Sequence, residues 1–450
     1  MNKYKPIIGL EIHTELKTNS KMFCACKNDP FGADQPNIYT CPVCLGMPGA
    51  LPIPNKKAIE WTIKLGLAVG CQINLFSKFD RKHYFYPDLA KGYQISQYDL
   101  PFCYQGQLNT SQGVVGINRI HLEEDTGKLL HETVDGKEVS LIDFNRSGVP
   151  LVEIVTEPDI TSAEQAHEYA KNLREIVRYL EIGDCKMAEG EMRLEANISL
   201  AKPGSDQLPN YKVEVKNINS FRFLEQAIKY EIDRQTKILD VGKVPVQETR
   251  GWDAENSRTF SQRTKEEAAD YRYFPDPDIP PIELTSQQVE LIRTSIPELP
   301  AEIRARWLQE FNLSENNAQQ LATNQEAVSF IENLFKAAKN QKIQPNDLAN
   351  DLVNKKITIE WEGSAASEQQ KRIVESILNA YQKLHQTTEI DQDDLDKVIK
   401  QVFDENPDAV DKFKSGKTQI VGFLMGQVMQ QLSEKPDPSQ LRQRIQDLLA

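Results

Sequence analysis

The sequence predicts an α+β protein, with strands and helices mixed in its N-terminal part and helices alone in its C-terminal part. Two observations support this prediction. Strict polar–apolar alternation over Glu191–Leu200 and Tyr211–Lys216 is typical of half-buried strands, and helical patterns surround it. After Thr294 the strand patterns end and amphipathic helices take over, for example at Gln369–Gln386.

Composition excludes several classes of protein. With 39% hydrophobic and 26% charged residues, wholesale disorder is not expected. No apolar run reaches membrane-spanning length, and no segment resembling a signal peptide follows the N-terminus. We therefore expect a cytoplasmic protein, in which clustered cysteines indicate metal binding or catalysis more often than disulfides. A net charge of −13 argues against broad electrostatic capture of nucleic acid, but it allows local basic spots.

Four cysteines occur as two close pairs, Cys24 with Cys26 and Cys41 with Cys44. Four thiolates in this arrangement suit a tetrahedral, structural Zn²⁺, although the first pair is one residue tighter than usual. The intervening segment is rich in Asn, Asp, Gly and Pro, so a metal would order a stretch with little core of its own. The alternative is a set of unrelated buried or reactive cysteines.

Three consecutive acids, Glu123, Glu124 and Asp125, follow a short apolar run. Burying like charges is costly unless a cation compensates, and carboxylates favour hard cations such as Mg²⁺. Glu11 and His13 share one face of a predicted strand, and Glu153 lies in another apolar stretch, so these residues could reach the same centre. We expect a metal site for phosphate chemistry; the alternative is an acidic surface loop beside ordinary strand ends.

Helices are predicted from Asn55 to Val69, from Thr161 to Gly183 and from Ser220 to about Leu239. Thr161 and Glu164 form a predicted capping box for the second helix. The two alternating strands place polar side chains on one face each, which suits either a solvent-facing sheet or the wall of a cleft.

Tyrosines and cations are interleaved between Lys78 and Gln97, an arrangement that suits base stacking beside phosphates or an aromatic loop packed on the core. Ser415–Thr418 fails as a phosphate-binding P-loop, because Asp411 replaces the first glycine. Between Gln247 and Pro281, clustered prolines argue against regular structure and predict the edge of the first domain.

Several blocks together resemble a known family, the B subunits of the aspartyl/glutamyl-tRNA amidotransferases. They are IGLEIHTEL, Lys78–Gln97, HLEEDTGK, DFNRSGVPLVEIV, ADYRYFP and the C-terminal GFLMGQVM, and they cover essentially the whole chain in order. The resemblance implies a bacterial or organellar ligase that uses ATP to phosphorylate the side-chain carboxylate of Glu-tRNA(Gln) or Asp-tRNA(Asn). Ammonia from a partner glutaminase, known as GatA, then displaces the phosphate, and a small third protein, GatC, completes the heterotrimer.

The resemblance also implies roles for particular residues. His13, Glu124 and Glu153 match positions that hold one Mg²⁺, for which Mn²⁺ can substitute, and Glu11 and Glu123 lie near a second divalent ion. The cysteines match the family's zinc-binding variant. We further expect phosphate or substrate contacts from four cations: Lys82, Lys91, Arg193 and Lys216.

The family fold implies a cradle-shaped catalytic domain at 1–294, a helical segment at 295–345 and a tRNA-binding tail at 346–450. Because the tail is net acidic, we expect a local basic patch, Lys412, Lys414 and Lys417, to contact tRNA. Two other functions stay open from the residues alone: a small-molecule carboxylate–amine ligase, and a non-enzymatic zinc module that scaffolds an RNA complex.

Overall fold

The computed structural model describes the chain except for short gaps. The described residues are 3–205, 207–264, 271–323, 325–358, 367–385, 392–415, 418–432, 436 and 438–449. Contacts divide the chain into two units, Met1–Ile303 and Arg304–Ala450. The first unit mixes strands with helices, and the described part of the second is helical, as the sequence predicts. The boundaries at 294 and 345 and the cradle shape stay predictions.

A nine-stranded sheet forms the centre of the first unit, in the order β14-β13-β12-β11-β1-β10-β7-β6-β2. Neighbouring strands run antiparallel, except for the parallel pair β12 and β13. The bounds are β1 Lys5–Glu15, β2 Gln72–Ile73, β6 Cys103–Thr110, β7 Gly113–Glu124, β10 Pro150–Thr156, β11 Met192–Ala201, β12 Val213–Ile218, β13 Glu248–Asp253 and β14 Arg258–Thr264.

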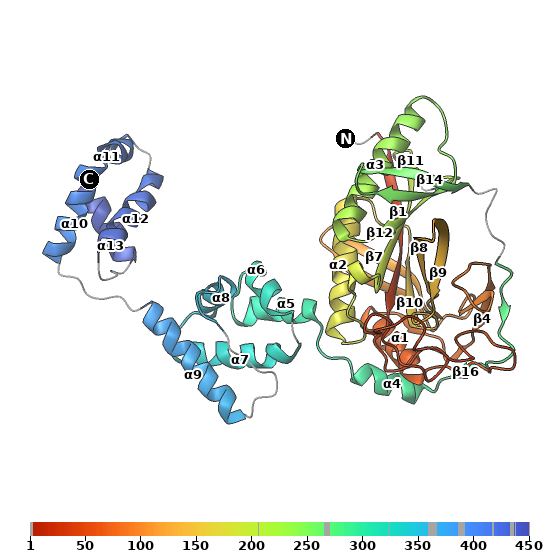
Figure 1. The fold of residues 1–450 in the computed structure, drawn as a ribbon. Helices are drawn as coiled ribbons and strands as arrows, with labels where there is room; N and C mark the ends of the chain where they lie inside the picture. Colours follow the sequence, from red (N-terminus) through yellow and green to blue (C-terminus); the bar gives the residue numbers. More distant parts are fainter. Residues whose placement is uncertain are drawn as a thin grey trace. The chain divides into compact units, whose positions relative to one another are not determined.

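Three helices pack on one face of this sheet: α1 Lys56–Ala68, α2 Ala163–Tyr179 and α3 Phe221–Asp240 (Figure 1). The even-numbered residues of β1 form part of the core between sheet and helices, and Ile8 and Ile12 are fully buried. The odd-numbered residues point to the opposite face, where Glu11 and His13 keep partial exposure. The sheet therefore has one covered face and one face left open for polar side chains.

Serine side chains cap the two long helices, as their sequences suggest. Ser220 Oγ accepts a hydrogen bond from Phe223 N at the start of α3. The predicted capping box of α2 is wrong by one residue. Its N-cap is Ser162, whose Oγ accepts from Gln165 N, while Gln165 Oε1 accepts from Thr161 N. Glutamine and glutamate both serve as the reciprocal acceptor, so the pattern alone fitted either register.

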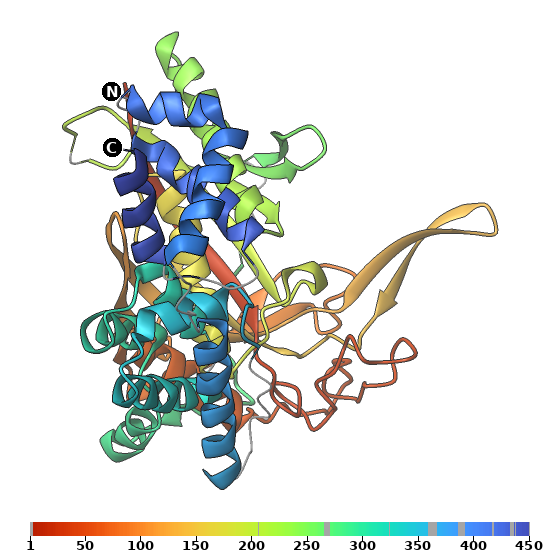
Figure 2. The same cartoon turned by 90° about the vertical axis from the view of Figure 1, so that its left-hand side faces the viewer.

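Smaller sheets flank the main one. The first has the order β15-β4-β5, the second pairs β16 with β3, and the third is the hairpin β8–β9, which extends away from the main sheet (Figure 2). Their bounds are β3 Phe76–Ser77, β4 Asp80–His83, β5 Tyr93–Ser96, β8 Lys128–Val134, β9 Lys137–Asp143, β15 Phe274–Pro275 and β16 Ile282–Glu283. The expectation of no regular structure near the prolines is therefore corrected, since β15 and β16 are two-residue edge pairings. Such pairings tolerate proline because the missing N–H is not needed by the sheet.

The remaining helices are short and amphipathic. The first unit ends with α4 Ser286–Thr294, and the start of α5 joins it to the second. The bounds beyond it are α5 Pro300–Glu310, α6 Glu315–Leu321, α7 Gln325–Asn340, α8 Pro345–Val353, α9 Ser367–Leu384, α10 Gln392–Glu405, α11 Pro407–Lys414, α12 Val421–Gln431 and α13 Pro438–Leu449. A separate apolar core joins α10 to α13. Among the described residues, no helix has the length and apolar character needed to cross a bilayer.

Trp307 is the largest fully buried side chain in the second unit, where it contacts the ring of Phe335 and donates a hydrogen bond from Nε1 to Glu332. We expect Trp307→Ala to lower the free energy of unfolding by about 3–5 kcal/mol, because it opens a large cavity. Urea denaturation followed by circular dichroism measures this loss. Phe423→Ala removes a half-exposed ring from the same unit and should cost little; equal losses would contradict the assignment of Trp307 to the core.

Candidate active site

The open face of the main sheet gathers ionisable side chains from four adjacent strands. His13 of β1 lies opposite Glu153 of β10 and Arg193 of β11, and Glu153 in turn lies opposite His121 of β7. Directly opposed residues in an antiparallel sheet point to the same side, with Cβ atoms about 5 Å apart. The register therefore brings together residues that lie far apart in the chain.

His13, Glu123 and Glu153 form the tightest of these groups, with one ligand atom from each lying within 4.8 Å of the others. His13 Nε2 is 3.3 Å from Glu153 Oε2 and 3.8 Å from Glu123 Oε1. Burial acts to raise the pKa of Glu153, but His121 and His13 outweigh it and hold the pKa well below its usual range. Two nearly buried carboxylates and an imidazole are a donor set that suits a divalent cation.

His121 belongs to the same group, and the sequence reasoning did not identify it. Its side chain is 3% exposed, and Nε2 lies 3.2 Å from Glu153 Oε2 and 3.7 Å from Glu123 Oε2. Burial lowers the pKa of His121, but the two carboxylates outweigh it and raise the pKa to about 9. The two-residue spacing from Glu123 was the available signal, because positions i and i+2 of a strand share a face.

Glu124 does not join this group, and its predicted partnership with His13 and Glu153 is corrected. Consecutive strand residues point to opposite faces, so Glu123 reaches the open face and Glu124 does not. Glu124 Oε1 instead lies 2.6 Å from Lys91 Nζ and accepts a hydrogen bond from Ile95 N. Lys91 and Glu124 line a separate cavity that also contacts Cys44.

Glu11 lies in a second acidic group rather than beside Glu123. Glu11, Glu195 and Glu214 each place a carboxylate oxygen within 4.8 Å of the others. Lys216 Nζ lies 2.9 Å from Glu195 Oε2 and 3.5 Å from Glu214 Oε1. Burial opposes protonation of Lys216, but the surrounding carboxylates outweigh it and raise its pKa. Asn197 Nδ2 donates to Glu11 Oε1, so this end of the open face is also polar.

Lys82 and Arg193 supply positive charge around the first group. Burial lowers the pKa of Lys82, but the negative charges of Glu123 and Glu153 outweigh it and raise the pKa, so the side chain carries a charge. The Lys82 ammonium lies 5.1 Å from the centre of the Tyr271 ring. Arg193 Nη2 lies 2.7 Å from Asp125 Oδ2, so part of its charge is already engaged.

Glu15 and Asp125 form a buried carboxyl pair next to this arginine. Burial and the negative charge of Asp125 raise the pKa of Glu15 to about 9, so Glu15 is protonated at neutral pH. Arg193 and Arg146 hold the pKa of Asp125 below its usual range against the effect of burial. Asp125 therefore neutralises two arginines, and the acid triplet divides among three separate environments.

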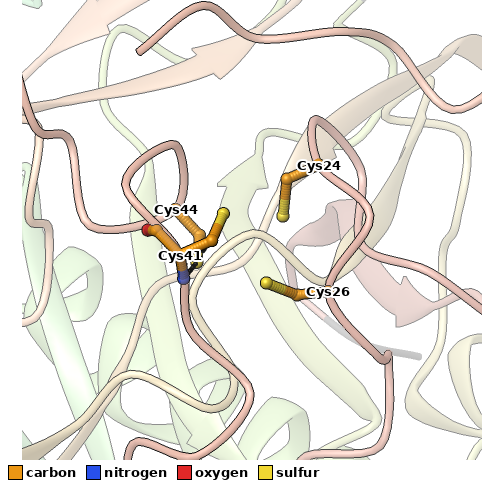
Figure 3. Close-up of side chains that lie close together, drawn as sticks. All are labelled: Cys24, Cys26, Cys41 and Cys44. Carbon is orange, nitrogen blue, oxygen red and sulfur yellow. Dashed lines mark hydrogen bonds between the residues drawn. The ribbon is translucent and has the colours of Figure 1, made fainter.

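The four predicted zinc ligands do lie together. Cys24 and Cys26 occupy one loop and Cys41 and Cys44 the facing loop, with the sulfurs turned toward the space between the loops (Figure 3). A hydrogen bond from Cys24 lowers the pKa of Cys44 to about 5, and the nearby Lys21 ammonium acts in the same direction. Four sulfurs within 4.8 Å of one another form a donor set that matches a tetrahedral thiolate site.

The predicted tRNA-binding lysines are only partly described. Lys412 and Lys414 lie in the last turn of α11 and are exposed. Lys417 lies outside the described residues.

Comparisons with known proteins agree along the whole chain. Residues 6–290 match the family model of the GatB/GatE catalytic domain, and residues 300–449 match that of the GatB domain. The relatives include proteins named as the B subunits of aspartyl/glutamyl-tRNA(Asn/Gln) amidotransferases. The one from Thermoanaerobacter pseudethanolicus is 42% identical, with 100% of both chains covered. The one from Brevibacillus brevis is 41% identical over 100% of this chain and 99% of the relative. The one from Dehalococcoides mccartyi is 42% identical over 98% and 97%. Both the family models and the full-length identity show that the chain belongs to the GatB family.

Proposed function

We propose that this chain is the ATP-dependent GatB component of a tRNA-dependent amidotransferase, converting Glu-tRNA(Gln), Asp-tRNA(Asn) or both to the amidated product. The observation that carries the proposal is the convergence of His13, Glu123 and Glu153 on the open face of the sheet in a chain of this family. A carboxylate is a poor acyl donor, so it must be activated before an amine can replace its oxygen. The site suits such activation by phosphate.

His13, Glu123 and Glu153 are the residues that would hold Mg²⁺ or Mn²⁺, with His121 beside them. The two carboxylates favour Mg²⁺, while the imidazole favours Mn²⁺. Glu11, Glu195 and Glu214 are the residues that would hold a second ion. Such ions, when bound, neutralise phosphate oxygens and template the reactants. Glu123 takes the role that the sequence assigned to Glu124.

In the proposed reaction, the substrate's side-chain carboxylate attacks the γ-phosphorus of ATP. The bond between that phosphorus and the bridging oxygen breaks, which gives an acyl phosphate and ADP. Ammonia then attacks the acyl carbon, phosphate leaves, and an amide forms. We assign Lys82, Arg193 and Lys216 to neutralising the charge that develops on phosphate oxygens, because all three cations lie at the open face. Lys91 instead pairs with Glu124.

The proposed partners follow from the two reactants that this chain must receive. Ammonia comes from a glutaminase of the GatA kind, with GatC completing a heterotrimer, and the aminoacyl group arrives on tRNA. We propose that Lys412, Lys414 and Lys417 contact the tRNA. The four cysteines would hold a structural Zn²⁺ whose closed coordination leaves no position for substrate.

We expect Glu123→Gln to reduce Glu-tRNA-dependent ADP formation by the heterotrimer by about 10²–10³-fold, because it removes a charged group aimed at the reacting phosphate. The same variant should weaken Mn²⁺ binding, measured by electron paramagnetic resonance, at least about tenfold.

Glu124→Gln is the matched control for that experiment, since it makes the same change one residue away on the other face of β7. It should leave Mn²⁺ affinity within about twofold. Loss of Mn²⁺ binding in Glu124→Gln but not in Glu123→Gln would overturn the proposed ligand set.

Zinc content should depend on the cysteine loops. We expect Cys41→Ser to lose bound Zn²⁺, measured by plasma mass spectrometry, and to lower the melting temperature, because the metal contributes to folding of these loops. Cys71→Ser changes a buried cysteine outside the group and should retain full zinc content. Equal zinc content in both variants would contradict the site.

Charge reversal of Lys412, Lys414 and Lys417 to glutamate should weaken tRNA binding and reduce its dependence on salt, because fewer counterions are released. Filter binding at several salt concentrations measures both effects. Reversal of Lys336, Lys355 and Lys371, other lysines of the same unit, controls for net charge. Unchanged affinity in the first variant would refute the tRNA contact.

A further inference from the structure

A cavity of about 450 Å³ lies on the open face of the main sheet, at the end away from His13. Gly9 and Glu11 of β1, Thr156 of β10 and Asn197 of β11 line it. Glu11 also belongs to the second acidic group, so the cavity and that group are adjacent. Because a strand rises about 3.3 Å per residue, His13 lies only about 7 Å further along β1. The cavity and the two ionisable groups therefore form one continuous row.

The lining of this cavity has the mixed character of a small-molecule site. Apolar surface comes from Ile7, Val155 and Leu208, while Asn210 and Gln247 contribute amide groups. Volumes of this size and a few convergent polar groups among apolar ones are typical of ligand pockets. Flat apolar surface with amides at its edge suits a planar heterocycle that stacks and also forms hydrogen bonds.

One polar atom of this lining lacks a partner. Asn197 Nδ2 donates to Glu11 Oε1, and Asn197 Oδ1 is buried with no hydrogen-bond partner among the described residues. Buried acceptors are satisfied in nearly all proteins, so this oxygen calls for a donor from a ligand or water. The hydroxyls and the exocyclic amine of adenosine supply such donors.

Gly9 provides the space, and neither its backbone nor its neighbours require a glycine. Its backbone lies outside the left-handed region, and a Cβ added there meets nothing closer than 3.8 Å, from Thr156 Oγ1. A larger side chain at this position would therefore enter the cavity without disturbing the strand.

We propose that this cavity binds an adenosine moiety, with its phosphates directed along β1 toward Glu11 and His13. The inference rests on the proposed function, which supplies two sources of adenosine: ATP and the 3′-terminal nucleoside of the aminoacyl-tRNA. Both present the same base and ribose, so binding measurements must separate them.

The test is a graded series, Gly9→Ala and Gly9→Val, in the heterotrimer. Binding of a non-hydrolysable ATP analogue with Mg²⁺ is measured by calorimetry, and binding of tRNA(Gln), with and without its terminal adenosine, by fluorescence. If the adenosine comes from ATP, Gly9→Val should raise the analogue's Kd about tenfold or more and leave both tRNA affinities unchanged. If it comes from tRNA, only the intact tRNA should bind more weakly.

Lys5→Val is the matched control, because Lys5 is exposed on the same face of β1 and does not line the cavity. Leu208→Ala is a second variant whose side chain is 66% exposed, so it tests the cavity without risk to the core. Unchanged affinity for all probes in the folded Gly9→Val and Leu208→Ala variants overturns the inference. If Gly9→Val loses analogue binding and the parent enzyme transfers no phosphate, the adenosine site stands and the proposed function fails.

Discussion

The central constraint is the pairing register of β1 between β10 and β11. It places Glu11, His13 and Glu153 on one open face, with Glu123 beside them, although like charges so close together repel. Histidines and lysines of the same chain compensate this repulsion, and the shifted pKa values of His121 and Glu153 record how strongly. Shifts of this kind gather at functional sites, because a site built to receive a cation or an anionic substrate must keep charge ready.

Strand alternation at the end of β7 separates two kinds of chemistry. Glu123 faces the open side of the sheet, where His13 and Glu153 lie, while Glu124 pairs with Lys91 and contacts a different cavity. Asp125 neutralises arginines beside the protonated Glu15. Three adjacent acids thus do three different things, and a substitution at any one of them should have its own signature.

The cysteine loops are tied to the segment that leads into β10. Ser147 Oγ donates to Cys44 O, and Lys21 Nζ donates to the carbonyl oxygens of Tyr39 and Phe144. Since β10 carries Glu153, order in these loops helps to hold that strand in place. A metal bound by the cysteines would therefore support the site through the fold, at a distance from the reacting groups.

Periodicity and motifs are local properties of a chain, and here they were enough to predict the α+β division, the main helices, the cysteine group and the family. Even the pairing of His13 with Glu153 follows from the family resemblance. The three-dimensional arrangement was needed to show that Glu123 rather than Glu124 joins them, that His121 belongs to the group, and that Glu11 lies with Glu195 and Glu214. Which face a side chain reaches depends on strand register. Register is set by pairing between segments far apart in the chain, such as β1 with β11, and no local pattern specifies it.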